Sequence, residues 1–252
     1  MAASRRFMVN SARVGAVLSL ALVMTASVLA QQETASQKRQ KAEWKKLTER
    51  SSVLYKQHRY EDAAAVGQEA LQLAERAFGP EHSYVATSLN NLALILEAQD
   101  KPNDIEPLLQ RSLAIREKAL GPNHQDVAKS LSNLGRLYHL KEQYEKAEPL
   151  YQRALAIWEA GPDPYSASLA TALHDLAALY RDEKRDADAE PLIKRELEIW
   201  EHTLGPDHPT LAFVLDSYAS VLRSVGNEKK AMSAESRANR IRRQLRDTET
   251  PE

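Results

Sequence analysis

Apolar residues recur along this chain at a constant interval of 42 residues. The three clearest columns are Leu47, Leu89, Leu131, Leu173 and Leu215; Ala63, Ile105, Ala147, Ala189 and Ala231; and Leu73, Ile115, Ile157, Ile199 and Ile241. A single globular core does not keep apolar positions at so fixed a spacing. A supersecondary unit copied five times does, because each copy buries its apolar face against the next. The sequence therefore predicts an elongated array of five units.

Within each unit the apolar residues follow helical spacing in two blocks. In the second unit, one face of the first helix carries Val85, Leu89, Leu92, Ala93 and Leu96. A polar break at 99–103 follows, and a second apolar helix then runs to Gly121-Pro122, a pair that stops helices. The same pair punctuates three other units, so we expect an all-α fold with two helices per unit.

Composition and charge exclude several classes of protein. The 252 residues carry a formal net charge of −1, which offers no global attraction for nucleic acid or for an anionic membrane. The chain has no cysteine, so thiol nucleophiles, zinc–thiolate sites, iron–sulfur clusters and disulfides are excluded. A chain without cysteine also suits an oxidising compartment, where a stray thiol is a hazard.

The N-terminal segment 1–30 has the three-part plan of a secretory signal peptide. Residues 1–13 are basic, residues 14–29 are apolar and uncharged, and Val28-Leu29-Ala30 resembles a cleavage site. The apolar run falls just short of the ~17–25 residues of a membrane-spanning helix. We therefore predict export, to the periplasm or out of the cell, with a membrane anchor formed by residues 14–30 as the alternative.

The unit resembles the tetratricopeptide repeat (TPR) in its small and large positions. Small residues in the first helix are Ser51, Ala93, Gly135, Ala177 and Ala219, and a Leu or Tyr lies three residues after each. The 42-residue period and phrases such as Ala147-Glu148-Pro149-Leu150-Tyr151 are similar to the kinesin-light-chain subgroup. The resemblance implies a TPR-like right-handed superhelical solenoid of about five helix–turn–helix repeats, used to bind another protein.

The chain is predicted to divide as follows: a signal peptide or anchor at 1–30; a polar linker or start of the first helix at 31–43; a TPR array at 44–246, with units at about 44–82, 83–124, 125–164, 165–208 and 209–246; and a disordered tail at 247–252. The terminal units carry polar residues where the interior units are apolar, as capping repeats require. Such caps predict a monomer.

By resemblance to peptide-binding TPR domains, the concave face of the first helices is the predicted partner-binding surface. Its candidate residues are Thr87, Asn90, Asn91, Lys129, Ser132, Asn133, Arg136, His174, Asp175, Asp216 and Ser217. Asparagine both donates and accepts, which suits the backbone of an extended peptide, and Lys129 and Arg136 could take a carboxylate. The alternative is that these are ordinary solvated helix residues.

Three histidines, His82, His124 and His208, each follow Gly-Pro-X and invite a metal interpretation. One histidine per unit places them roughly 8–10 Å or more apart, whereas zinc needs its donors at about 2 Å from one point. We therefore interpret them as loop and helix-cap residues and predict no metal and no cofactor. Trp158 and Trp200 share a column and are interpreted as packing between units, with a partner contact as the alternative.

No nucleophile, base and orienting group occur together in a catalytic pattern, so we predict no enzyme. The sequence favours an exported scaffold or adaptor that binds a protein or an extended peptide segment, with no nucleic acid and with membrane contact only through an uncleaved N-terminus. The alternatives are a membrane-anchored structural assembly module and an enzyme with an unrecognised site.

Overall fold

The computed structural model describes residues 34–101 and 104–249, which form ten α-helices and no strand. They are α2 (Ala35–Lys56), α3 (Tyr60–Phe78), α4 (Ser83–Ala98), α5 (Ile105–Leu120), α6 (Gln125–Leu140), α7 (Tyr144–Glu159), α8 (Ala167–Asp182), α9 (Asp186–Leu204), α10 (Pro209–Ser224) and α11 (Glu228–Glu249). The predicted all-α fold with two helices per unit is confirmed in these residues.

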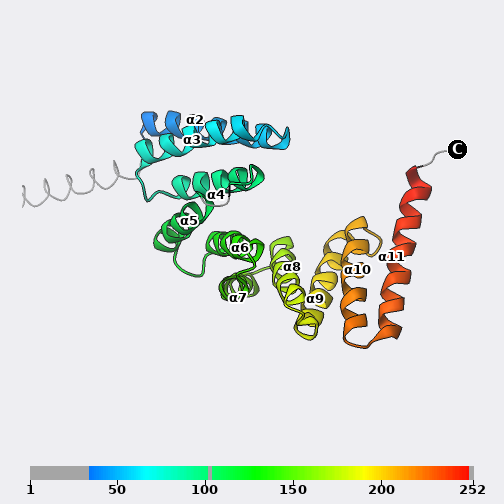
Figure 1. Cartoon of the computed structure of the whole chain (residues 1–252). Helices are drawn as coiled ribbons and strands as arrows, with labels where there is room; N and C mark the ends of the chain where they lie inside the picture. The colour runs from blue at the N-terminus through cyan, green and yellow to red at the C-terminus, as the bar shows by residue number, and fades with distance from the viewer. Residues whose placement is uncertain (1–33, 102–103, 250–252) are drawn as a thin grey trace, which may run out of the picture.

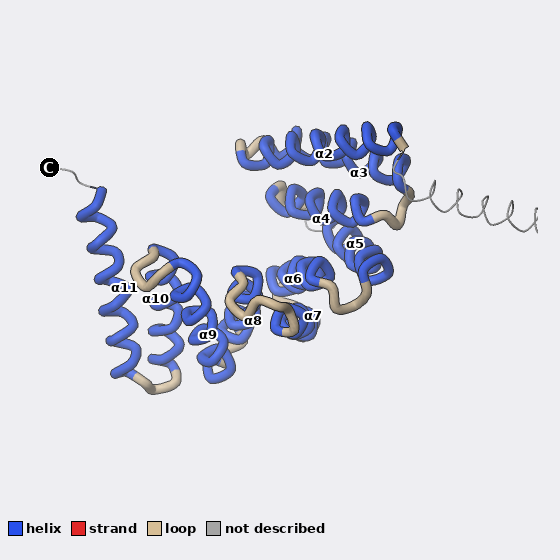
Figure 2. The backbone as a smooth tube through the Cα atoms, turned by 180° about the vertical axis from the view of Figure 1, so that it is seen from behind, coloured by secondary structure: helices blue, strands red, loops and turns tan. Residues whose placement is uncertain are grey.

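Each helix packs against the next one along the chain, and the five pairs follow one another along an arc (Figure 1). The view from behind shows the same arc (Figure 2). In both views α4 and α6 lie on its inner side, and α5 and α7 lie on its outer side. The first helices of successive units are therefore neighbours on the inner side.

The apolar columns form the seam between helices. Leu89, Leu131 and Leu173 are fully buried, as are Ala147 and Ala189. Buried residues from α4 to α11 join in one hydrophobic cluster, and two smaller clusters hold other buried residues of α2 to α5 at the N-terminal end. Burial is weakest in the first unit, where Leu47 is only partly buried because no earlier described unit covers it.

The histidines after Gly-Pro cap first helices. The Nδ1 atoms of His82, His124 and His208 accept hydrogen bonds from the backbone N–H groups of the second residues after them, at 3.1–3.3 Å. In the fourth unit Ser166 caps the first helix in the same way, since its Oγ accepts from the Leu169 N–H at 3.3 Å. These bonds satisfy donors that a helix start leaves unpaired, so the interpretation as cap residues is confirmed.

The cap at His208 carries a testable consequence. Replacing His208 by alanine should lower the free energy of unfolding by about 1 kcal/mol, because the N–H of Thr210 loses its acceptor. Replacing it by serine should cost much less, because Ser166 shows that serine caps the same position in this array. Urea unfolding of both variants checks this, and an equal loss in the two would contradict the cap role.

Outer helices of neighbouring units are joined by a repeated ion pair that the sequence analysis missed. Arg111 pairs with Glu75 at 2.7 Å, and Arg153 pairs with Glu117 at 2.6 Å. The same pair recurs as Arg195 with Glu159 and as Arg237 with Glu201. The guanidinium groups of Arg111, Arg153 and Arg237 also donate to the carbonyls of Pro80, Pro122 and Pro206. These contacts bridge successive units on the outer side.

The C-terminal prediction is partly wrong. Helix α11 continues to Glu249, into the segment 247–252 that was expected to be disordered. Nothing in the sequence stops it before Pro251, which disfavours helix at the residue before it. At the other end α2 begins at Ala35, inside the segment predicted as linker or helix start, with Thr34 as its cap.

The predicted signal peptide at 1–30 lies outside the described residues. Among the helices of residues 34–101 and 104–249, none has the length and apolar character needed to cross a membrane. In that same part of the chain, no group of three or more histidine, aspartate or glutamate side chains is placed to hold a metal ion.

Candidate functional site: a groove along the first helices

Three adjoining hollows follow the first helices from α2 to α8. The N-terminal hollow, of about 360 Å³, lies between α2 and α4 and includes Tyr55, Asn91 and Leu94. The central hollow, of about 370 Å³, shares Tyr55 and Leu94 with it and adds Asn133 and Arg136 of α6. The Asp175 hollow, of about 290 Å³, shares Asn133 and Arg136 and reaches α8. Because neighbouring hollows share lining residues, they form one groove.

Six of the eleven predicted residues line this groove. Asn91 lies in the N-terminal hollow, whereas the Asp175 hollow contains Lys129, Ser132, Asn133, Arg136 and Asp175. Their first helices align because the 42-residue period returns each position to the same helix face in every unit. The floor of the Asp175 hollow is Trp158 of α7, which is only 6% exposed. Its burial favours the packing interpretation, although its edge borders the groove.

The other five predicted residues do not line the three hollows. Asn90 is buried between α4 and α6 and donates to Ser130, so it is not available to a partner. The Thr87 hydroxyl donates to its own helix at the Ser83 carbonyl. Asp216 forms an ion pair with Arg242 of α11, and Ser217 lies beside it on α10.

His174 is hydrogen-bonded to a side chain of its own unit. Its Nδ1 lies 3.2 Å from a carboxylate oxygen of Glu196, a side chain of α9 that is almost completely buried. This hydrogen bond raises the pKa of His174 above its ordinary value, against the opposing effect of burial. The Nδ1 atom of His174 is therefore engaged within its own unit, and the residue does not line the three hollows.

The two cations of the groove are already paired with carboxylates. Arg136 makes two hydrogen bonds to the two carboxylate oxygens of Glu97 on α4, one of them at 2.6 Å. Lys129 lies 2.9 Å from Asp126, one turn earlier on the same helix. A carboxylate of a partner would therefore have to compete with Glu97 for Arg136 and with Asp126 for Lys129.

Asp175 has no such partner. Within residues 34–101 and 104–249, no hydrogen bond or ion pair reaches its carboxylate, and Arg136, His174 and His139 act on it only from longer range. Burial raises the pKa of Asp175 to about 6 from an ordinary value of 3.8. A carboxylate held in this state costs stability, and such groups concentrate at binding sites.

The amides of Asn91 and Asn133 are also free in the described structure. Both are half-buried in the groove, and no hydrogen bond to another described residue occupies either amide. Each amide offers two donor hydrogens and an acceptor oxygen. They occupy equivalent positions in successive units, so they present the same polar group twice along the groove.

The first unit supplies groove residues that the sequence analysis left out. The N-terminal hollow is also lined by Thr48, Glu49 and Ser52, and Tyr55 joins it to the central hollow. The signal was present, because Glu49 stands 42 residues before Asn91, and Ser52 stands 42 residues before Leu94. The predicted columns began one unit too late.

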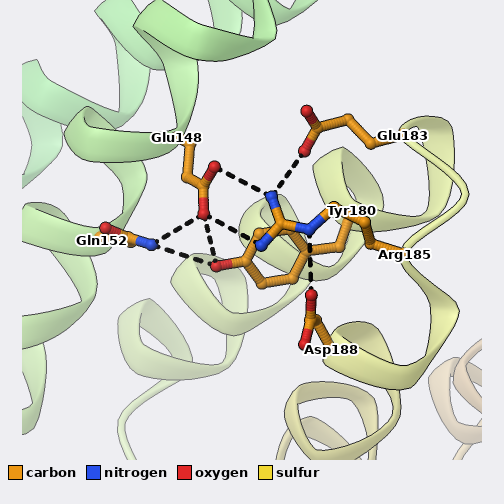
Figure 3. Close-up of polar contacts among 6 residues, drawn as sticks. All are labelled: Glu148, Gln152, Tyr180, Glu183, Arg185 and Asp188. Carbon is orange, nitrogen blue, oxygen red and sulfur yellow. Dashed lines mark hydrogen bonds and ion pairs between the residues drawn. The ribbon is translucent and has the colours of Figure 1, made fainter.

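A second polar cluster links neighbouring units outside the groove (Figure 3). The Tyr180 hydroxyl donates to Glu148 of α7 at 3.0 Å, and Arg185 donates to the same carboxylate and to Glu183 and Asp188. The Arg185 guanidinium also lies 4.1 Å from the centre of the Tyr180 ring. The hydrogen bond from Arg185 lowers the pKa of Glu148.

The cluster recurs one unit earlier, where Tyr138 donates to Glu106 at 2.8 Å and Lys141 takes the place of the arginine. In both copies the carboxylate accepts hydrogen bonds from a tyrosine and from a cation of the same chain. We interpret the cluster as a structural link between units.

Sequence comparison agrees with the geometry. The sequence profile of the tetratricopeptide repeat matches residues 46–118, 84–160 and 168–244. The chain belongs to the tetratricopeptide repeat family. The TPR array is a scaffold of the kind that mediates contact between proteins.

Solved structures place it beside kinesin-light-chain-like TPR proteins. A Podosopora anserina putative kinesin light chain with nearly identical TPR-like repeats is 20% identical, with a TM-score of 0.71, over 81% of this chain and 96% of that one. BtubC (BKLC) from P. vanneervenii is 21% identical, also with a TM-score of 0.71, over 85% of this chain and 91% of that one. Among curated protein sequences, none matches this chain.

Proposed function

We propose that this TPR protein is an exported, non-enzymatic adaptor that holds an extended segment of another protein in the groove along α2, α4, α6 and α8. The observation that carries the proposal is the pair of free amides, Asn91 and Asn133, at equivalent positions of one continuous groove. Amides at a regular interval can pair with the backbone of an extended chain whatever its side chains are.

Export rests on the sequence of the N-terminal segment 1–30. A basic start, an uncharged apolar run, and Val28 and Ala30 at the −3 and −1 positions favour cleavage after Ala30. The N-terminal sequence of the protein recovered from its native compartment tests this, since a mature protein that begins at Gln31 is expected. A protein that retains Met1 in a membrane fraction would contradict it.

Replacing Asn91 and Asn133 together by leucine should reduce partner capture about tenfold while leaving helicity unchanged. Each substitution removes hydrogen bonds to the captured backbone, worth about 0.5–1.5 kcal/mol apiece. The measurement is affinity capture from the native compartment, quantified by mass spectrometry, with circular dichroism as the folding check. Asn239→Leu on exposed α11 is the matched control. If the double variant captures as much as the wild type, the groove is not the binding surface.

A further inference from the structure

In the groove, the positive charges have partners within the chain, whereas the carboxylate of Asp175 has none among the described residues. Its arginine is held bidentately by Glu97, and its lysine is held by Asp126, so both cations are neutralised within the chain. Asp175 is the groove carboxylate that no described group binds. A ligand that enters the Asp175 hollow therefore meets one uncompensated negative charge and no uncompensated positive charge.

The other end of the groove exposes mainly apolar surface, and the one carboxylate that borders it there, Glu49, lies 3.8 Å from Lys45. Tyr55 and Leu94 face both the N-terminal and the central hollow and are 39% and 37% exposed, and Ile95 lies beside them. When a partner covers large apolar side chains that are exposed in a concave surface, the free energy of the complex is lowered. This end favours an apolar side chain, whereas the α8 end favours a cation.

The distance between the two ends sets a spacing in the partner. The N-terminal hollow lies between α2 and α4, and the Asp175 hollow lies between α6 and α8, two first-helix spacings further on. At roughly 10 Å per spacing the ends are roughly 20 Å apart. An extended chain advances about 3.3 Å per residue, so about six residues separate the two positions.

We propose that the groove selects extended segments that carry an apolar side chain at the N-terminal hollow and a lysine or arginine, about six residues away, against Asp175. The proposal rests on the proposed function and adds the chemistry of the partner. A guanidinium or ammonium group at Asp175 forms a charge-assisted hydrogen bond in a half-buried site, where such bonds are strong. Binding of the cation also relieves the cost of burying this carboxylate, which burial alone shifts toward its protonated form.

The test is selection of random 12-residue peptides displayed on phage against the purified full-length protein, run in parallel on three proteins. They are the wild type, Asp175→Asn, and the control Asp207→Asn, which removes an exposed carboxylate from the loop between α9 and α10. We expect lysine and arginine at one position of the wild-type and control peptides, about six residues from an apolar one. The Asp175→Asn selection should lose the basic position and keep the apolar one.

The peptide with the wild-type consensus is then synthesised, together with a copy in which norleucine replaces the basic residue. Norleucine should weaken binding to the wild type and to Asp207→Asn about tenfold, and should leave binding to Asp175→Asn unchanged. Such non-additivity would show that the basic side chain of the peptide contacts the carboxylate of Asp175. Circular dichroism confirms that the three proteins are folded alike.

The results separate this proposal from the proposed function. Peptides that lose binding to the Asn91→Leu/Asn133→Leu protein, yet prefer acidic residues or show no coupling to Asp175, overturn the proposal and leave the groove as the binding surface. If no selected peptide is sensitive to that double variant, both are overturned.

Discussion

Replacing Gly135 by alanine is expected to lower the free energy of unfolding by about 2 kcal/mol, as overpacking of a core typically does. A Cβ atom at this position would lie 2.9 Å from two carbons of the Tyr151 ring, closer than side chains approach one another. Tyr151 is 1% exposed and is packed between helices, so it cannot move away without disturbing its neighbours. The midpoint of urea unfolding measures the loss.

The neighbouring units suggest a second substitution that should remove the effect of Gly135→Ala. They pair an alanine with a smaller partner, Ala93 with Leu109 and Ala177 with Ile193, at the positions of Gly135 and Tyr151. In a Tyr151→Leu protein, Gly135→Ala should therefore be neutral or stabilising, by up to about 1 kcal/mol, because alanine is the better helix former. If the two substitutions were simply additive, the predicted contact between Gly135 and Tyr151 would be wrong.

Replacing Asp175 by asparagine is expected to stabilise the protein at pH 7.5 by about 1–2 kcal/mol while it weakens ligand binding. Asparagine stands at the equivalent positions 91 and 133, so the backbone and the groove already accept it. The gain comes from removing a charge that burial disfavours, and it stays below the ~3 kcal/mol of the full pKa shift because the carboxylate still borders solvent. Gains of stability at the expense of binding are typical of functional positions.

The sign of the pH dependence follows from the same shift. The folded protein holds a proton on Asp175 up to about pH 6, whereas the unfolded chain loses it near pH 3.8. Between these values the folded state binds more protons, so stability falls as the pH rises. The advantage of Asp175→Asn should therefore be small at pH 4.5 and full at pH 7.5. His174, whose pKa is raised mainly by Glu196, adds a further fall in stability as the pH rises from its ordinary pKa of 6.5 to its raised one. Asp175 contributes to that raise, so this fall should be smaller in Asp175→Asn.

Urea unfolding of the wild type and of Asp175→Asn at several pH values between 4.5 and 7.5 measures this difference. Asp207→Asn serves as the control, because it removes a charge that is exposed and should change stability by less than about 0.5 kcal/mol at any of these values. A constant difference across the range would show that the carboxylate is ionised throughout and that burial does not govern it.

Much of the fold follows from patterns that act over short stretches of chain. Helical spacing of apolar residues, Gly-Pro stops and histidine or serine starts all operate within a turn or two, so they could be predicted without knowing the fold. The period of 42 then predicted that the units stack, because a unit of two amphipathic helices has no other place to bury its faces. The predicted end of the array was wrong at α11 because no residue before Pro251 stops the helix.

The site was only half predictable. The columns correctly brought Asn91, Asn133 and Asp175 to one face, since residues 42 apart repeat the same orientation. They could not show that Asn90, one residue from Asn91, is buried between α4 and α6. A rotation of about 100° per residue separates exposed from buried neighbours on a helix, and where that boundary falls depends on how closely the next unit packs.

The sequence by itself determined the repeat, the helix pairs, their caps and which residues share a face of the first helices, because each depends on local spacing or on identity between units. Only the tertiary structure decided which charged groups of that face are already paired within the chain. Arg136 meets Glu97 from 39 residues away, and His174 meets Glu196 from 22 residues away, whereas no cation in the described part of the chain lies within bonding distance of Asp175. The first pair depends on how successive units are placed, and the second depends on how α8 packs against α9 within one unit. Neither arrangement is encoded in a local pattern.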